Sequence, residues 1–389
     1  MNSNDKLSQS VYASVGKMLT RYEFDGDRSS LIKRETLELP FNVQYAWAHP
    51  TQPFLYLACS NGSPSEVGSA HCLVSLVLNG QSGVMSRMGE PVGLAARAVH
   101  MTLDQKGQFI LVAYNKPSRV SVHRLLANGL IGEEVEQTQT LDTGIYAHQV
   151  RVSLSNKSVI VVARGNNAKE NQPEDPGSLR VFSFSESGQL KTSSTVAPKQ
   201  GYGFGPRHLD FHPSKPWVYV SLERQNVVHM YLANEMGDQV ADQPSYVKPT
   251  LSEEPGSRPR QRSGTVHVHP NGRSVYVANR ASGLDSEQMY VGGENNIAVY
   301  RIDAISGEPT IIQHMDTRGV VARTFALDKT GTLLLAANSQ TIRVKKDGQQ
   351  TLIPASLALF HVLNDGSLAY VGKTDVPVGE EVLFWMGIA

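Results

Sequence analysis

One short pattern occurs six times along the chain, and this repetition constrains the fold more than any other feature. In each copy a strand-like run leads into a turn and continues as a second run rich in β-branched and aromatic residues. The clearest copy runs from Gly205 to Glu223. The residue before the turn recurs at positions 49, 104, 153, 212, 269 and 328, at intervals of 49 to 59 residues. Such a period predicts a ring of four-stranded units.

The two ends of the chain complete a seventh unit. Residues 381–387 align with the first strand of the pattern, and residues 10–15, 18–24 and 31–39 resemble its second, third and fourth strands. A unit shared by both ends leaves no open sheet edge in the ring. The sequence therefore predicts an all-β, seven-bladed β-propeller with four-stranded blades, closed by N- and C-terminal strands, in a single domain over residues 1–389.

Several segments depart from the short-turn pattern. Residues 165–177, 281–294 and 340–354 are expected to be loop insertions, and residues 244–263 to be the longest irregular segment. A fourth strand of blade two is expected over residues 134–141. The insertions should rim the face on which first strands begin and second strands end, since loops on a rigid scaffold usually carry function.

Two columns of residues are predicted to surround that mouth of the ring. The first column is Gln44, Val99, His148, Arg207, Gly264, Arg323 and Glu381, and the second is Ser60, Asn115, Arg164, Glu223, Arg280, Ser339 and Gly16. Of these, His148, Arg207, Glu223 and Arg280 come from neighbouring blades and should form a cluster. An imidazole or a carboxylate can move a proton, and guanidinium groups can hold an anion or a developing oxyanion. A ring of solvated polar residues with structural ion pairs is the alternative.

Three phrases of the sequence resemble the seven-bladed propeller lactonase family. They are Gly205–Pro213 with the following Val218–Glu223, then Val275–Arg280, and Arg323–Asp328. The family includes bacterial propeller-type 6-phosphogluconolactonases and fungal 3-carboxy-cis,cis-muconate lactonizing enzymes, and the resemblance spans essentially the whole chain. It implies that the active-site residues are the four of the predicted cluster.

The expected activity is hydrolysis of a small lactone without a metal or organic cofactor. Arg164, Arg323, His100 and Asn115 are expected to contact the substrate. Additional arginines in the rim segment, at positions 258, 260 and 262, favour a phosphorylated or carboxylated sugar-type lactone. Which of the imidazole and the carboxylate acts as base stays open. The alternatives are a muconate-type lactonizing enzyme or cycloisomerase and a non-enzymatic interaction platform.

Charge and composition narrow the range of partners. The chain carries 36 basic and 36 acidic residues, with a pI of about 7.2, so net charge indicates neither a nucleic acid nor a membrane as partner. The N-terminal residues are polar, and a cytoplasmic location is expected. Cys59 and Cys72 have no metal-binding spacing and are expected to be reduced. His267 and His269 alternate as a metal pair would, but the shared His-Pro turn favours a structural role for His269.

Overall fold

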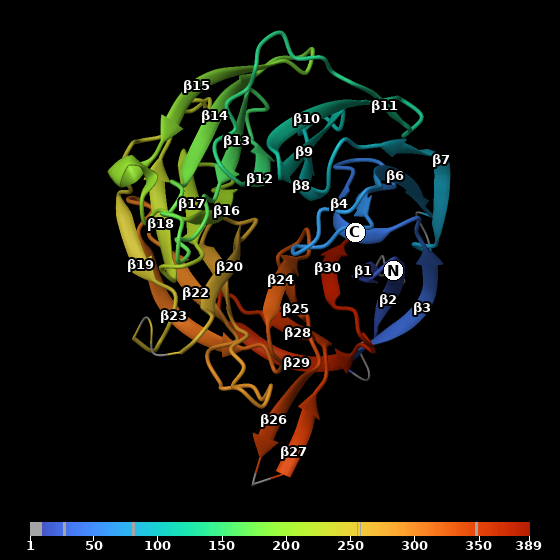
Figure 1. Ribbon diagram of the computed structural model, residues 1–389, viewed down its shortest axis with the longest axis vertical. Coiled ribbons are helices and arrows are strands. Elements are labelled where there is room, and N and C mark those ends of the chain that lie inside the picture. The colour runs from blue at the N-terminus through green and yellow to red at the C-terminus, as the bar shows by residue number, and fades with distance from the viewer. Residues whose placement is uncertain (1–9, 26–28, 80–81, 255, 257, 347–348) are drawn as a thin grey trace, which may run out of the picture.

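The computed structural model describes residues 10–25, 29–79, 82–254, 256, 258–346 and 349–389. Seven four-stranded antiparallel sheets stand around a central axis, and the first strand of each sheet lies nearest that axis (Figure 1). The predicted seven-bladed β-propeller is confirmed.

Blades one to three follow one another along the chain. Blade one contains β4 (Asn42–Ala48), β5 (Phe54–Ser60), β6 (His71–Leu78) and β7 (Met85–Gly93). Blade two contains β8 (Ala98–Leu103), β9 (Phe109–Asn115), β10 (Ser118–Leu125) and β11 (Ile131–Glu134). Blade three contains β12 (Ala147–Val152), β13 (Ser158–Ala163), β14 (Ser178–Phe184) and β15 (Leu190–Val196).

Blades four to six continue in the same way. Blade four contains β16 (Pro206–Phe211), β17 (Trp217–Leu222), β18 (Val227–Leu232) and β19 (Tyr246–Pro249). Blade five contains β20 (Gln261–Val268), β21 (Ser274–Ala281), β22 (Asn296–Ile302) and β23 (Pro309–Asp316). Blade six contains β24 (Ala322–Leu327), β25 (Leu333–Asn338), β28 (Ser356–Val362) and β29 (Leu368–Asp375). A separate hairpin, β26 (Ile342–Lys346) and β27 (Gln349–Ile353), projects beyond the ring (Figure 1).

Both ends of the chain build blade seven, as predicted. Its strand order is β3 (Ser30–Glu38), β2 (Met18–Asp25), β1 (Ser10–Val15) and β30 (Leu383–Ile388). The N-terminal strand β1 pairs with the C-terminal strand β30 from Val11 opposite Ile388 to Val15 opposite Leu383. This pairing closes the ring by backbone hydrogen bonding between the two ends of the chain.

Burial between adjacent blades explains the composition of the strands. The central strands β13 and β17 are buried along their whole length, because each blade packs against a neighbour on both faces. Ile160 and Val162 of blade three pack in one core with Val218 and Val220 of blade four. The outer strands face water and carry mixed sequences, as in β7, where most residues are partly or fully exposed.

In blades one, four and five, a histidine in the turn between the first and second strands links the blade to the next. Nε2 of His212 lies 2.9 Å from the carbonyl oxygen of Gly272, and Nε2 of His269 lies 2.9 Å from that of Gly331. The Nδ1 atom of His269 accepts a hydrogen bond from the backbone of Asn271 at 3.0 Å. These two contacts give His269 the structural role that the sequence predicted.

Three predicted segments differ from the structure. The fourth strand of blade two is β11, over residues 131–134 and not 134–141, because a tight turn with Gly129 at φ +82° reverses the chain earlier. The segment 244–263 is not irregular throughout, since it contains β19 and the beginning of β20. The loop predicted over residues 340–354 contains instead the paired strands β26 and β27, and Ile342 of β26 packs beside Val320 and Val321.

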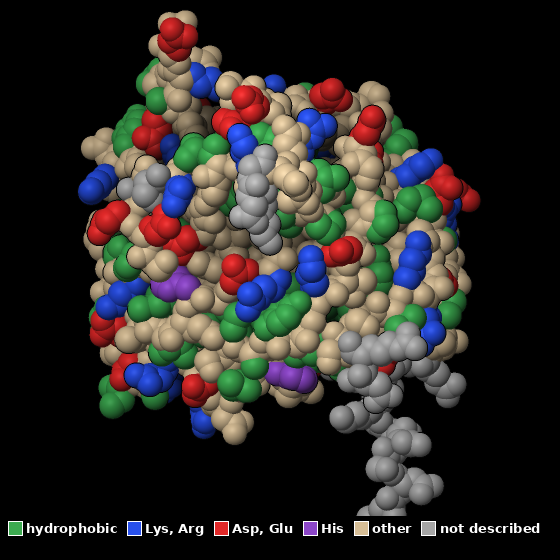
Figure 2. All heavy atoms as spheres, turned by 90° about the horizontal axis from the view of Figure 1, so that it is seen from below, with side chains coloured by type: hydrophobic (Ala, Val, Ile, Leu, Met, Phe, Trp, Pro, Cys, Tyr) green, Lys and Arg blue, Asp and Glu red, His purple; other side chains and the backbone are tan. Residues whose placement is uncertain are grey.

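The rest of the described chain is turn and loop. One short 3-10 segment, Pro198–Gly201, is present, with Lys199 and Gln200 in left-handed backbone conformation. No helix in the described ranges has the length and apolar character to cross a membrane. Figure 2 shows one side of the ring, where basic and acidic side chains are interspersed and no single charge dominates.

Candidate active site

A β-bulge at the mouth of the ring defines the first column of candidate residues. In blades one to six the pairing between first and second strands shifts near the start of the first strand. The residues left without a partner are Gln44, Val99, His148, Arg207, Gly264 with Thr265, and Arg323. Bulges redirect side chains and are frequent beside active sites. Six of these residues, His148, Arg207 and Arg323 among them, line one pocket at the axis, which we call the inner pocket.

Blade seven corrects the predicted position of Glu381. The pairing of β1 with β30 skips Phe384, so that Phe384, not Glu381, occupies the bulge position of this blade. Glu381 is exposed and precedes β30. Phe384 lines the inner pocket, and the guanidinium carbon of Arg323 lies 3.9 Å from the centre of its ring. The column of bulge residues therefore has one carboxylate fewer than the sequence suggested.

Glu223 is the centre of a cluster of guanidinium groups. It follows β17 in blade four, and its side chain is 3% exposed. Arg164 of blade three donates a hydrogen bond from Nη1 to Oε2 at 3.0 Å, and Arg280 of blade five donates one from Nη2 to Oε1. Nε of Arg207 lies 3.2 Å from Oε1, and Nη1 of Arg262 lies 3.7 Å from Oε2. The structure thus brings three of the four predicted catalytic residues into contact around one carboxylate.

These neighbours fix the charge state of Glu223. Burial alone would raise its pKa, but Arg280, Arg207 and Arg164 outweigh burial and hold the pKa well below its usual value of 4.5. Glu223 is therefore ionised at neutral pH. A carboxylate with so low a pKa is a weak base, and its geometry suits a group that orients the surrounding guanidiniums.

The arginines remain in excess over the carboxylate. Burial and the nearby guanidinium of Arg280 lower the pKa of Arg323 to about 10, which leaves it cationic at neutral pH. Arg323 makes no ion pair with any acidic group that the structure describes; its Nε donates a hydrogen bond to the carbonyl oxygen of Phe384 at 3.2 Å. Nη1 of Arg207 is buried and has no hydrogen-bond partner among the described residues. Buried donors of this kind need an acceptor, so the pocket is built for an oxygen-rich group.

His148 presents a neutral imidazole to the same pocket. Burial, followed by the charge of Arg207, lowers the pKa of His148 well below its usual value of 6.5. Its ring is stacked with that of Tyr146, at 6.3 Å between centroids and 17° between planes. Nδ1 of His148 is buried and lacks a hydrogen-bond partner in the described part of the chain. A neutral imidazole with a free nitrogen can accept a proton from water.

Two expected substrate-binding residues lie away from this cluster. His100 is 1% exposed and is not part of the inner pocket's lining, but its ring lies 4.1 Å from that of Tyr45 and 5.8 Å from that of His208, which both line that pocket. Asn115 faces a different pocket beside Arg97, whose Nη2 lies 3.5 Å from its Oδ1. Of the other two expected substrate-binding residues, Arg164 contacts Glu223 in the cluster and Arg323 lines the inner pocket.

The sequence did not single out the aromatic side chains of the site. The centre of the Tyr146 ring lies 4.0 Å from the guanidinium carbon of Arg164, and the same ring is stacked with the imidazole of His148. Tyr45 and Trp385 line the inner pocket with Phe384. An aromatic residue two positions before His148 is the only sequence signal for Tyr146, and such a residue is common in β-strands.

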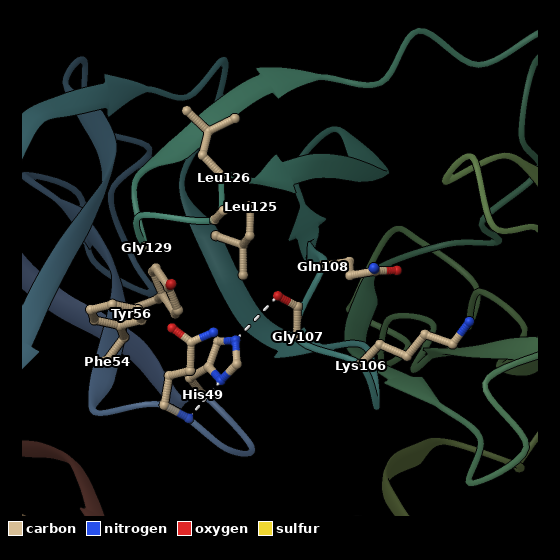
Figure 3. Close-up of a pocket in the computed structure, with 11 residues that line it drawn as sticks. His49, Phe54, Tyr56, Lys106, Gly107, Gln108, Leu125, Leu126 and Gly129 are labelled. Atoms are coloured by element: carbon tan, nitrogen blue, oxygen red, sulfur yellow. Dashed lines mark hydrogen bonds between the residues drawn. The ribbon is translucent and has the colours of Figure 1, made fainter.

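A second pocket, between blades one and two, has no arginine or carboxylate among its lining residues. It lies beside the turns at the other edge of the blades, and Figure 3 shows His49, Phe54 and Lys106 among its lining residues. Nε2 of His49 lies 3.2 Å from the carbonyl oxygen of Gly107, and its Nδ1 accepts backbone hydrogen bonds from Thr51 and Gln52. Both nitrogens are thus occupied, Nε2 by a contact with blade two and Nδ1 by the turn of blade one itself. We therefore place the candidate active site at the mouth.

The chemical groups at the mouth are imidazole, carboxylate and guanidinium. Within the described ranges no three His, Cys, Asp or Glu side chains are placed to hold a metal ion together. Cys59 and Cys72 are buried free thiols on facing positions of β5 and β6.

The fold and the cluster together define a propeller with an arginine-rich, carboxylate-centred mouth. The chain matches the family described as "Lactonase, 7-bladed beta-propeller" over residues 8–347, and it belongs to that family.

The chain is also similar to proteins that are named lactonases. The 6-phosphogluconolactonase of Bacillus subtilis is 23% identical over 352 residues, covering 87% of this chain and 90% of that protein. The 6-phosphogluconolactonase of Pectobacterium carotovorum is 23% identical over 329 residues, covering 84% and 87%. Among solved structures, a periplasmic gluconolactonase of Pseudomonas aeruginosa superimposes with a TM-score of 0.72 at 18% identity, covering 95% of this chain and 97% of that chain. A putative 6-phosphogluconolactonase from Bacteroides uniformis gives a TM-score of 0.72 at 16% identity, covering 99% and 100%. These structures share the fold.

Proposed function

We propose that this protein hydrolyses a small, anionic sugar-type lactone, as 6-phosphogluconolactonases do. One observation carries the proposal: Arg207 and His148 line the same pocket, and each has a buried polar atom without a hydrogen-bond partner among the described residues. A lactone carbonyl and an attacking water would supply the missing acceptor and donor. A cytoplasmic location stays a prediction from the sequence.

The proposed reaction uses His148 as the general base. His148 takes a proton from water while the water oxygen attacks the lactone carbonyl carbon. The oxyanion of the tetrahedral intermediate accepts hydrogen bonds from Arg207, which is already cationic and fixed before the reaction. When the ring C–O bond breaks, the imidazolium returns its proton to the leaving alkoxide oxygen. The carboxylic acid that is formed ionises and releases one proton to solvent.

Glu223 has an orienting role in this proposal. Its low pKa and its pairs with Arg164 and Arg280 make it a fixed negative charge that holds the guanidiniums in place. These contacts and the low pKa support the imidazole of His148, and not the carboxylate of Glu223, as the base in this proposal. The low dielectric of the buried site strengthens these contacts.

A direct assay separates the candidate functions. The purified protein is mixed with 6-phosphogluconolactone, with gluconolactone and, in a third reaction, with a carboxymuconate, and proton release is followed together with ring opening or closure. Opening of the sugar lactone with one proton released per turnover supports the proposal. Ring closure of the muconate would favour a lactonizing enzyme. Absence of turnover in all three reactions would favour a binding platform.

A further inference from the structure

A second pocket at the mouth, which we call the rim pocket, holds four arginines. It lies between blades five and six and is lined by Arg260, Arg262, Arg280, Arg323, Ser282 and Gln340. Arg323 also lines the inner pocket, so the two pockets are adjacent. A ligand in the inner pocket can therefore extend into the rim pocket along Arg323.

Two of these arginines stand directly opposite each other in the sheet. Arg262 of β20 and Arg280 of β21 are cross-strand partners in the register of blade five. Like charges in facing positions destabilise a sheet. The carboxylate that both approach is Glu223, which Arg164 and Arg207 share. The facing pair is thus incompletely neutralised by the acidic groups that the structure describes.

The backbone around the rim pocket also departs from ordinary geometry. Arg260 has φ +53° and Val321 has φ +58°. The left-handed region is unfavourable for residues with a Cβ atom, and most of all for a β-branched residue such as valine. Arg260 is exposed, and no described acidic side chain lies within ion-pair distance of it. Strained residues of this kind cluster at functional sites.

We infer that the rim pocket binds a phosphoryl group carried by the substrate, with Arg260 and Arg262 as specificity-determining residues. This inference rests on the proposed function, since it places the lactone ring in the inner pocket and its charged substituent at the rim. A phosphoryl dianion has three oxygens for the planar forks of several arginines, whereas a single carboxylate has two oxygens and one charge. Four guanidiniums beside one shared carboxylate fit the dianion.

The test compares two lactones that differ only in the phosphoryl group. The double variant Arg260→Gln/Arg262→Gln is assayed with 6-phosphogluconolactone and gluconolactone. The ratio of kcat/KM for the phosphorylated over the unphosphorylated substrate is expected to fall about 100-fold, because each lost charge-assisted contact contributes about tenfold. Arg301→Gln, which removes an exposed arginine on β22, is the matched control and should keep the wild-type ratio. An unchanged ratio in the double variant would overturn the inference.

A binding experiment keeps this inference separate from the proposed function. Inorganic phosphate and acetate are titrated into the wild type and the double variant by calorimetry. Phosphate is expected to bind the wild type, acetate about tenfold or more weakly, and phosphate binding should weaken about 100-fold in the double variant. Equal binding of phosphate by both proteins, or of phosphate and acetate by the wild type, would overturn the inference. If the wild type opens neither lactone but binds phosphate through these arginines, the lactonase proposal fails and the phosphoryl site stands.

Discussion

Arg164 of blade three donates a hydrogen bond of 3.0 Å to Glu223 of blade four, across the boundary between two blades. The same carboxylate accepts a hydrogen bond from Arg280 of blade five. Three blades are therefore joined at the mouth by one buried charge. This connection makes the stability of the ring and the geometry of the candidate site depend on the same residue.

Replacement of Glu223 should disturb both properties. Glu223→Gln removes the negative charge from among the guanidiniums, and we expect kcat for the lactone to fall about 100-fold, because the arginines lose their positions. The melting temperature should fall too, and added sulfate should restore part of it by supplying an anion. Glu186→Gln, whose side chain is 91% exposed in its pair with Lys106, is the control and should change neither quantity. A Glu223→Gln variant of wild-type stability without a sulfate effect would contradict the central role of this charge.

The pH dependence of catalysis should report His148. The base must be neutral to act, and burial lowers its pKa below 6.5, so kcat/KM should rise with pH through a midpoint below 6.5 and then level off. His148→Ala should lower kcat about 10²- to 10⁴-fold, and added imidazole should recover part of the loss. An acid limb centred above 6.5, or near wild-type turnover in the variant, would show that another group is the base.

Two buried histidines at the inner pocket, His208 in its lining and His100 beside it, should make the fold sensitive to acid. Burial lowers the pKa of His100 and of His208 well below 6.5, so the unfolded chain binds more protons than the folded protein at mildly acidic pH. Their stabilising effect is present above pH 6.5 and is lost as the pH falls toward their folded-state pKa values. The urea midpoint should fall between pH 8 and pH 5. His100→Gln should reduce this dependence, whereas the exposed His361→Gln should leave it unchanged.

The contacts between turns of adjacent blades predict the effect of one added methyl group. Gly272 has φ +72°, and a Cβ atom there would lie 2.5 Å from Nε2 of His212. We expect Gly272→Ala to lower the free energy of unfolding by about 2 to 4 kcal/mol, from backbone strain together with loss of the contact between blades. Gly379 has φ +57° with open space around it, so Gly379→Ala should lower the free energy of unfolding by only about 1 kcal/mol, from backbone strain alone. Equal effects of the two substitutions on urea unfolding would argue that the contact between His212 and Gly272 does not stabilise the protein.

Closure of the ring can be tested at β30. Leu383 is fully buried between blades six and seven, and an aspartate there would place an unpaired charge in the core. Leu383→Asp should lower the melting temperature sharply and promote aggregation, since release of β30 exposes the edge of β1. Ile305→Asp, at a residue 92% exposed, should have little effect. A stable, soluble Leu383→Asp variant would mean that the pairing of the chain ends contributes little.

The sequence by itself determined the seven-bladed ring and most of the charged residues of the candidate site. The repeated pattern specified seven blades and the closing strands, because inner strands buried on both faces must be continuously apolar and each blade needs the same turn. The same repeat placed His148, Arg207 and Arg323 in one column. Only tertiary structure decided how these side chains are used. The bulge that directs them into the inner pocket comes from strand pairing, which a residue pattern does not reveal.

Register also explains the residues that sequence alignment misplaced. Counting from the previous blade put Glu381 in the column, but the shift in pairing between β1 and β30 put Phe384 there, so an aromatic ring stacks on Arg323 in place of a carboxylate. Likewise, Arg262 was expected in a loop, and its membership of β20 sets it opposite Arg280. Local sequence fixes which residues form strands, whereas the partner strand fixes which side chains meet. The charge balance of the mouth is therefore a property of the tertiary structure.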